Sequence, residues 1–345
     1  MANLRDVAER AGVDPSTASR VLRGDPSQQV RPETRERILA AARELAYRPN
    51  ALARGLRTRR TETIGLIIPS LDNLGFADVT HGIQAEAALR RRLVMVVDAG
   101  AAAGTGEDRE AAAAAAYDRL IGDGRLDGLI VAFASLDDRQ VARLATQGVP
   151  LVLVNRRTIG VHGSVVVDDA RGVACAVEHL AALGHRRIGL VGLDADTDTA
   201  RRRVLGYRSA MTAAGLAVDA RWSADGEPTV EGGRAATERI LAVGRRARPT
   251  GLVVASLMSA VGVLAALRDA NVKVPEQLSV VAFNDHPFAE HTAPPLTAVR
   301  MPNRRMGEEA VRMLLAAIEG APVGDLVIAD PPELIVRRST AAPPR

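Results

Sequence analysis

Hydroxyl and guanidinium side chains gather on one face of a short helix that the sequence predicts near its N-terminus. Asp14 can cap this helix, with Pro15 at its first position. The outward face then carries Pro15, Ser16, Thr17, Ser19 and Arg20. Hydroxyls and arginines at such positions contact phosphates and base edges, but Pro15 and Ser16 offer little hydrogen-bonding capacity, so we expect part of the specificity to lie elsewhere. Arg20 can pair bidentately with guanine. The pattern predicts a helix that enters the major groove of DNA; a packed helical hairpin without DNA is the alternative.

A second group of polar residues lies at or near the ends of strands that are predicted further along the chain. Ligands of parallel α/β lobes bind outside the carboxyl ends of the strands, so we expect these side chains to converge on one cleft. The polar candidates are Ser70, Asp72, Asn73, Asn155, Arg203, Ser256 and Asn284, and Phe133 is an aromatic candidate for the same cleft. A buried arginine such as Arg203 can bind a carboxylate, a phosphate or a pair of hydroxyls. A capping or crossover-loop role is the alternative at each single position.

Catalytic and metal-binding patterns find little support in the sequence. The only lysine, Lys273, belongs to no phosphate-binding glycine loop. The only cysteine, Cys175, can form neither an internal disulfide nor a cysteine-rich metal site. None of the six histidines shows the spacing of a metal site. We therefore expect no enzymatic activity, no metal and no cofactor.

Charge is distributed unevenly along the chain. Residues 1–60 hold 13 arginines against 7 acidic residues, a net charge of +6, whereas residues 61–345 hold 32 basic and 34 acidic residues, a net charge of −2. This asymmetry predicts a polyanionic partner for a small leading domain; a basic solvated tail is the alternative. The N-terminus lacks the apolar run of a signal peptide and no apolar stretch is long enough to span a membrane, so we expect a cytoplasmic protein with no membrane partner.

Hydrophobic periodicity predicts three helices around the basic residues. Leu4, Val7, Ala8 and Ala11 mark a first helix that ends at Gly12. The helix capped by Asp14 follows across a tight turn. A third helix begins near Pro32, with its inward face expected at Ile38, Leu39, Ala42 and Leu45. Together these form a helix-turn-helix with a supporting helix.

The rest of the chain alternates short apolar strands with helices, which is typical of parallel βαβ units. A first series of strands is predicted at 64–69, 93–97, 128–131 and 151–154, and a second at 165–167, 188–191, 251–254 and 278–283. The predicted fold class is therefore α/β, with two parallel-sheet lobes behind a helix-turn-helix head.

Long stretches of the chain resemble the LacI/GalR family of bacterial transcription regulators. The similar segments are 4–13, 16–22, 30–38 and 45–58 in the N-terminal part, and 69–73, 179–188, Arg203 with Gly206 and Tyr207, and 280–285 in the remainder. The resemblance implies a DNA-binding domain over 1–48 and a hinge over 49–60, with DNA contacts also from Leu4, Thr34, Arg35, Tyr47, Asn50, Ala53 and Leu56. In this family the hinge helices fold in the minor groove, where Leu56 would wedge between base pairs.

The family's body is similar to periplasmic sugar-binding proteins. This similarity implies one lobe over 61–157 and 302–323, a second over 158–301 and 324–338, and a tail over 339–345. Many sugar-responsive relatives have aspartates where this chain has Asn155 and Asn284, and Asn-Asp where it has Ser256 and Leu257. An amide both donates and accepts, whereas a carboxylate only accepts. Few rings are available to stack on a sugar: Phe133, Tyr207, Trp222, Phe283 and Phe288.

The resemblance implies a ligand-responsive transcriptional regulator, in most cases a repressor, that binds a pseudo-palindromic operator as a homodimer. Its effector would be a sugar or a related metabolite in the cleft between the lobes. No leucine heptad follows at the C-terminus, so we expect a dimer, not a tetramer. A sugar-binding receptor without regulatory function and an α/β enzyme with a nucleic-acid anchor are the alternatives.

Overall fold

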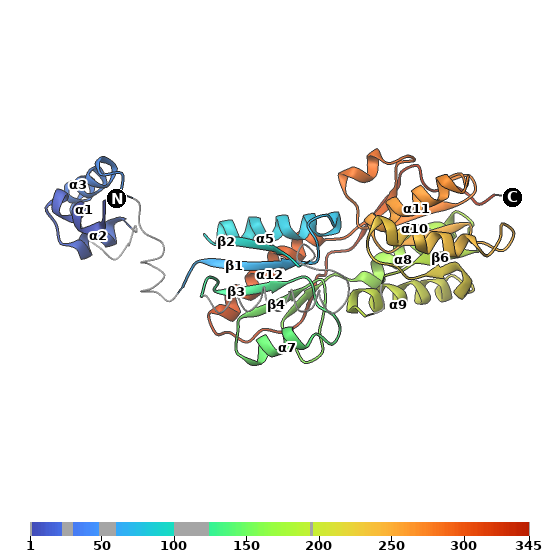
Figure 1. Ribbon diagram of the computed structural model, residues 1–345, viewed down its shortest axis with the longest axis horizontal. Helices are drawn as coiled ribbons and strands as arrows, with labels where there is room; N and C mark the ends of the chain where they lie inside the picture. Colours follow the sequence, from blue (N-terminus) through green and yellow to red (C-terminus); the bar gives the residue numbers. More distant parts are fainter. Residues whose placement is uncertain (1, 23–29, 48–59, 100–123, 194–195, 345) are drawn as a thin grey trace. The chain divides into compact units, whose positions relative to one another are not determined.

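The computed structural model describes residues 2–22, 30–47, 60–99, 124–193 and 196–344 (Figure 1). It divides into two compact units, Met1–Thr61 and Glu62–Arg345. We refer to them as the head and the body. The hinge residues Asn50, Ala53 and Leu56 lie outside the described residues.

The head consists of the three predicted helices, each with an identifiable start. Helix α1 (Leu4–Ala11) begins in a capping box of Asn3 and Asp6 and ends at Gly12, whose φ of 65° suits glycine. Helix α2 (Pro15–Leu22) is capped by Asp14, whose carboxylate accepts from the Ser16 amide at 2.7 Å. Helix α3 spans Pro32–Glu44. The predicted helix-turn-helix with a supporting third helix is therefore confirmed.

The core of the head differs at one position from the expectation. Its buried side chains are Val7, Ala8, Ala11, Ala18, Val21, Ile38, Ala41 and Ala42. Leu39 was expected to point inward, but it is 41% exposed, so that prediction was wrong. The inward face of α3 runs through Ile38, Ala41, Ala42 and the half-buried Leu45. One residue along a helix turns by about 100°, which carries Leu39 away from that face.

The body contains two six-stranded sheets, and each forms the centre of one lobe. The first has the order β11-β5-β4-β3-β1-β2 and all its pairs are parallel. Its strands are β1 (Thr63–Ile68), β2 (Leu93–Asp98), β3 (Gly128–Val131), β4 (Leu151–Val154), β5 (Ser164–Val166) and β11 (Leu326–Val327). The second has the order β12-β10-β9-β8-β6-β7. Its strands are β6 (Ile188–Val191), β7 (Ser223–Ala224), β8 (Gly251–Val254), β9 (Ser279–Phe283), β10 (Thr297–Arg300) and β12 (Glu333–Ile335), the last antiparallel to β10.

All eight predicted strands form, but one lies in a different sheet from the series to which it was assigned. Strand β5 was expected to open the second lobe, yet it pairs with β4 in the first sheet, and β11 pairs with β5. The Asp325 carboxylate fixes this edge, since it accepts from the amide and the hydroxyl of Ser164 at 3.0 and 2.8 Å. The chain therefore enters the second lobe after β5 and after β11, later than the boundaries expected at 157 and 323.

Helices cover both faces of each sheet (Figure 1). In the first lobe α5 and α12 share one core, and α7 belongs to another. In the second lobe α8 and α9 pack together on one face, and α10 and α11 on the other. The bounds are α5 Ala77–Leu89, α7 Arg139–Thr146, α8 Asp169–Ala182, α9 Asp198–Ala213, α10 Val230–Leu241, α11 Leu257–Asp269 and α12 Asn303–Ile318, with short 3-10 helices η1 Leu74–Phe76, η2 Ala220–Trp222 and η3 Pro287–His291.

A buried histidine joins the C-terminal segment to the second lobe. His185 contacts the Thr250 hydroxyl at 2.9 Å through Nδ1 and the Ala341 carbonyl oxygen at 2.9 Å through Nε2. Burial lowers the pKa of His185 below its ordinary value, so folding favours the neutral ring. A base whose pKa is depressed on folding contributes stability above its unfolded pKa of about 6.5, and this stability is lost as the pH falls below that value.

We therefore expect the thermal unfolding temperature of the body to fall between about pH 7 and pH 5, and the fall to be smaller in His185→Gln. Fluorescence of Trp222, the only tryptophan, reports unfolding of the second lobe. His179 contacts the Thr340 hydroxyl at 3.0 Å, and burial lowers its pKa as well. Because His179 is present in both proteins, it contributes equally to the pH dependence of each. Equal pH dependence in both proteins would contradict the role given to His185.

Candidate functional site

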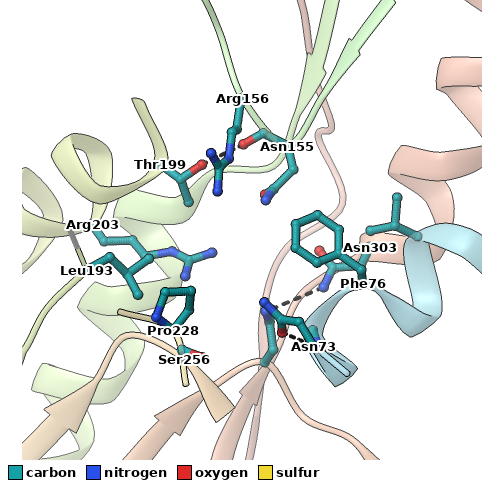
Figure 2. Close-up of a pocket in the computed structure, with 13 residues that line it drawn as sticks. Asn73, Phe76, Asn155, Arg156, Leu193, Thr199, Arg203, Pro228, Ser256 and Asn303 are labelled. Carbon is teal, nitrogen blue, oxygen red and sulfur yellow. Dashed lines mark hydrogen bonds between the residues drawn. The ribbon is translucent and has the colours of Figure 1, made fainter. Parts of the chain in front are cut away.

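Two adjoining chambers lie in the cleft between the lobes, where the carboxyl ends of both sets of parallel strands meet. The inner chamber has a volume of about 40 Å³ and is lined by Asn73, Gly75, Phe76, Val79, Asn155, Arg156, Leu193, Thr199, Arg203, Pro228, Ser256, Asn284 and Asn303 (Figure 2). The outer chamber has a volume of about 440 Å³ and is lined by Pro69, Ser70, Asp72, Asn73, Phe133, Ser135, Asp138, Arg156, Asp196, Thr197, Glu227, Pro228, Thr229, Val230, Glu231 and Met258. Asn73, Arg156 and Pro228 border both chambers.

Every candidate cleft residue from the sequence lines one of these chambers. Asn155, Arg203, Ser256 and Asn284 border the inner chamber, and Ser70, Asp72 and Phe133 border the outer one. Asn73 borders both. The structure therefore brings the eight predicted residues to one cleft, as expected.

Two asparagines occupy equivalent places in the two lobes. Asn155 directly follows β4 and Asn284 directly follows β9, with φ angles of 66° and 69°. Asparagine adopts this left-handed backbone more readily than most residues because its short polar side chain can bond locally. These positions therefore suit asparagine for backbone reasons as well as for any contact with a ligand.

Arg203 is the most deeply buried cation at the cleft. It lies on α9, and its Nε donates to Asp169 at 2.7 Å while Nη1 donates to the Ala255 carbonyl. Its guanidinium stacks 3.9 Å from the centroid of the Phe283 ring. Burial lowers the pKa of Arg203, and the neighbouring Asp169 opposes that shift. These contacts fix the plane of the guanidinium before any ligand arrives.

Asp169, which the sequence analysis did not single out, organises this end of the cleft. Its side chain is fully buried at the start of α8 and pairs with both Arg203 and Arg202. Arg202 also pairs with Asp198 at 2.9 Å and donates to the Asn155 carbonyl at 3.1 Å. One carboxylate thus couples α8 and α9 to the turn after β4.

The wall of the inner chamber formed by the first lobe centres on Asn73 and Asn303. The Asn73 side chain accepts from the Gly75 amide at 3.0 Å and caps η1, which places the Phe76 ring at the chamber. The Asn303 amide donates to Asn284 Oδ1 at 3.1 Å, which connects α12 to the turn after β9. Phe76 and Asn303 were missed because η1, which contains Phe76, and β10, which precedes Asn303, were not predicted.

Two of the candidate rings lie away from the chambers, and Ser256 lies at a cap position without capping its helix. Tyr207 is buried in the core and donates to the Ile188 carbonyl at 2.8 Å, and burial raises its pKa to about 12. Trp222 donates to the Ala247 carbonyl, and neither ring lines a chamber. Ser256 occupies the cap position of α11, yet its hydroxyl makes no capping hydrogen bond. Its side chain therefore remains available to the inner chamber.

The head presents the predicted DNA-contacting residues on its surface. Pro15, Ser16 and Arg20 are exposed on α2, and Thr17 and Ser19 are half-buried there. Thr34 and Arg35 lie in the first two turns of α3, where they are half-buried and exposed, and Leu4 and Tyr47 are half-buried. These positions leave the outward face of α2 accessible to a partner.

Within the described residues, no group of three or more histidine, cysteine, aspartate or glutamate side chains could hold a metal ion. Among the helices that the structure describes, none is long and apolar enough to cross a membrane.

Comparison with known proteins agrees with this two-part organisation. Residues 3–50 match the model of bacterial regulatory proteins of the lacI family, and residues 177–340 match a periplasmic binding protein-like domain. The transcriptional regulator MalR of Streptomyces coelicolor is 36% identical over 99% of this chain and 97% of its own length. The chain therefore belongs to the LacI/GalR family of bacterial transcriptional regulators, which are not enzymes.

Solved structures of the same family share the fold. The lac repressor dimer bound to operator and the anti-inducer ONPF matches 99% of this chain and 99% of its own, with a TM-score of 0.84 and 28% identity. The complex of the regulator CelR with cellobiose matches 98% of this chain and 100% of its own, with a TM-score of 0.72 and 29% identity.

Proposed function

We propose that this protein is a repressor that binds a pseudo-palindromic operator as a homodimer and changes its DNA affinity when a small metabolite occupies the cleft. The observation that carries this proposal is the combination in one chain of a head with an open arginine- and hydroxyl-bearing α2 and a body with a two-lobed ligand cleft. Such a protein works where operator DNA is found, so we also propose a cytoplasmic location.

The DNA contacts follow from the chemistry of the head and from the family. The outward residues of α2 would meet base edges in the major groove, and Thr34, Arg35 and Tyr47 would hold the DNA backbone. Asn50, Ala53 and Leu56 of the hinge would contact the minor groove, with Leu56 as the wedge. Two heads related by a twofold axis read two half-sites, which is why the operator should be a pseudo-palindrome.

Coupling between cleft and head follows from linkage. Occupancy of the cleft would favour one relative arrangement of the lobes and thereby change the readiness of the paired hinges to fold on DNA. An effector that weakens operator binding must itself bind more weakly to the DNA complex by the same factor. The coupling free energy is typically about 1–3 kcal/mol. Measurement of effector affinity with and without operator therefore tests the coupling directly.

Selection from randomised duplexes with the full chain tests the proposal. We expect enrichment of one palindromic sequence, and no enrichment with the variant Ser16→Glu/Arg20→Glu, in which carboxylates replace groups on the open face of α2 and repel phosphates. Circular dichroism and Trp222 fluorescence should show that this variant keeps its fold. Absence of any enriched sequence at low salt would contradict a sequence-reading head.

Arg20 should contribute to the choice of base. We expect Arg20→Ala to relax preference at one position of each half-site by about 1–3 kcal/mol, because a bidentate pair with guanine is lost. Affinities for a series of operators changed at single positions measure this effect, and Arg37→Ala on the exposed face of α3 serves as the control. A uniform loss over all sequences would instead identify Arg20 as a phosphate contact.

A further inference from the structure

The two chambers of the cleft differ in the charge of their polar side chains. Among its described lining residues the inner chamber has four asparagines and two arginines but no carboxylate. The outer chamber is lined by the carboxylates Asp72, Asp138, Asp196, Glu227 and Glu231. A ligand that spans both chambers therefore meets a different environment at each end.

Hydrogen bonds within the protein already use several acceptors of the inner chamber. Asn73 Oδ1 accepts from the Gly75 amide, and Asn284 Oδ1 accepts from Asn303. In the described part of the chain, no acceptor contacts the amide nitrogens of Asn73 and Asn284. The side-chain amide of Asn155 can donate or accept. The chamber therefore offers a ligand several N–H donors, beside the Ser256 hydroxyl and the side-chain oxygens of Asn155 and Asn303.

Arg203 adds a permanent charge to these donors. Its side chain is only 6% exposed, and Figure 2 shows its guanidinium directed into the chamber. Nε and Nη1 have the partners described above, whereas Nη2 has no acceptor among the described residues. Asp169 pairs with both Arg202 and Arg203, and Arg202 pairs in addition with Asp198. A ligand oxygen in the chamber can therefore accept a charge-assisted hydrogen bond from Nη2.

We propose that the effector places an anionic oxygen group, a carboxylate or a phosphate, in the inner chamber and a hydroxylated body in the outer one. This inference rests on the proposed function, since it specifies the ligand of the same cleft. The inner volume of about 40 Å³ accommodates roughly three water-sized groups, which matches the oxygens of such an anion. The outer carboxylates accept from hydroxyls and repel the anion, so they fix the orientation of the ligand. The effector is thus an acidic derivative of a sugar.

Simple anions test this proposal without knowledge of the effector. Trp222 fluorescence follows thermal unfolding of the body at constant ionic strength in chloride, acetate or inorganic phosphate. We expect acetate or phosphate to raise the unfolding temperature of the wild-type protein. Asn73→Asp should lower the affinity for the anion at least about tenfold, because a carboxylate replaces a hydrogen-bond donor. The carboxylate introduced by this substitution can still accept from the Gly75 amide, so the local fold is retained in the variant.

Asn271→Asp introduces the same chemical change at an exposed position away from the cleft and should behave as the wild type. Asn155→Asp provides a second variant inside the chamber. A stronger effect of acetate assigns the anion as a carboxylate, and a stronger effect of phosphate assigns it as a phosphate. Equal responses of wild type and both chamber variants would overturn the proposal, as would tighter binding of glucose than of gluconate and glucose 6-phosphate. Binding of a neutral sugar that also shifts operator affinity would refute this inference while leaving the proposed function intact.

Discussion

We expect Asp169→Asn to lower the free energy of unfolding by about 3–5 kcal/mol, because it leaves the buried charge of Arg203 without its counter-ion. Asp169 is fully buried and is shared by Arg202 and Arg203. An amide can accept a hydrogen bond but carries no charge to balance the Arg203 guanidinium, whereas Arg202 keeps its pair with Asp198. Urea unfolding followed by Trp222 fluorescence measures the loss.

The same substitution should also weaken binding of acetate or phosphate in the inner chamber, since it frees Arg203 from the orientation that its ion pair and the Phe283 ring define. Asp168→Asn is the matched control. Asp168 is exposed and caps α8 through the Arg171 amide at 2.9 Å, and asparagine caps a helix about as well as aspartate.

A double-mutant cycle separates the charge from the packing. Arg203→Met alone removes the cation, and in the Asp169→Asn background it should restore part of the lost stability, because no uncompensated charge then remains at this position. Strictly additive losses for the two changes would show that the pair does not stabilise the cleft.

Local sequence signals were sufficient to predict much of the fold and the residues that line the cleft. Caps, periodic apolar faces and short buried strands are encoded within a few residues, as Asp14 and Gly12 illustrate. The candidates after β4 and β9 could be predicted because a buried strand fixes where its carboxyl end lies. The DNA contacts and the lobe assignments depended further on the resemblance to the family.

The features that the sequence did not reveal depend on contacts between distant segments. Strand β11 has two residues, and its place in the first sheet follows from pairing with β5, far away along the chain. Asp168 and Asp169 are the same residue type in adjacent positions, and only packing of α8 against α9 decides that one caps a helix while the other holds two arginines. Tertiary structure, not local pattern, separates their roles.

Gly262→Ala should lower the free energy of unfolding by more than about 3 kcal/mol, although alanine is the better helix former by roughly 1 kcal/mol in an exposed helix. A Cβ at Gly262 would lie 1.9 Å from the Val230 carbonyl oxygen, and one at Gly233 would lie 2.0 Å from that of Ser259. Helices α10 and α11 therefore cross with backbone against backbone, and a methyl group must separate them.

This separation should affect the ligand as well as stability, because Thr229 and Ser256, the cap residues of α10 and α11, border the cleft. Gly324→Ala, with open space around its Cβ, is the control and should change stability by less than about 0.5 kcal/mol. A loss below about 1 kcal/mol in Gly262→Ala would mean that the helices adjust at little cost.

The first lobe repeats the arrangement, which extends the prediction to both halves of the body. A Cβ at Gly82 on α5 would lie 2.0 Å from the Arg304 carbonyl oxygen, and one at Gly307 on α12 would lie 2.2 Å from that of Val79. Because the body is one compact unit, Gly82→Ala should lower the midpoint of the unfolding transition that Trp222 fluorescence reports, even though Trp222 lies in the other lobe. A Trp222 transition that Gly82→Ala leaves unchanged would instead show that the lobes unfold independently.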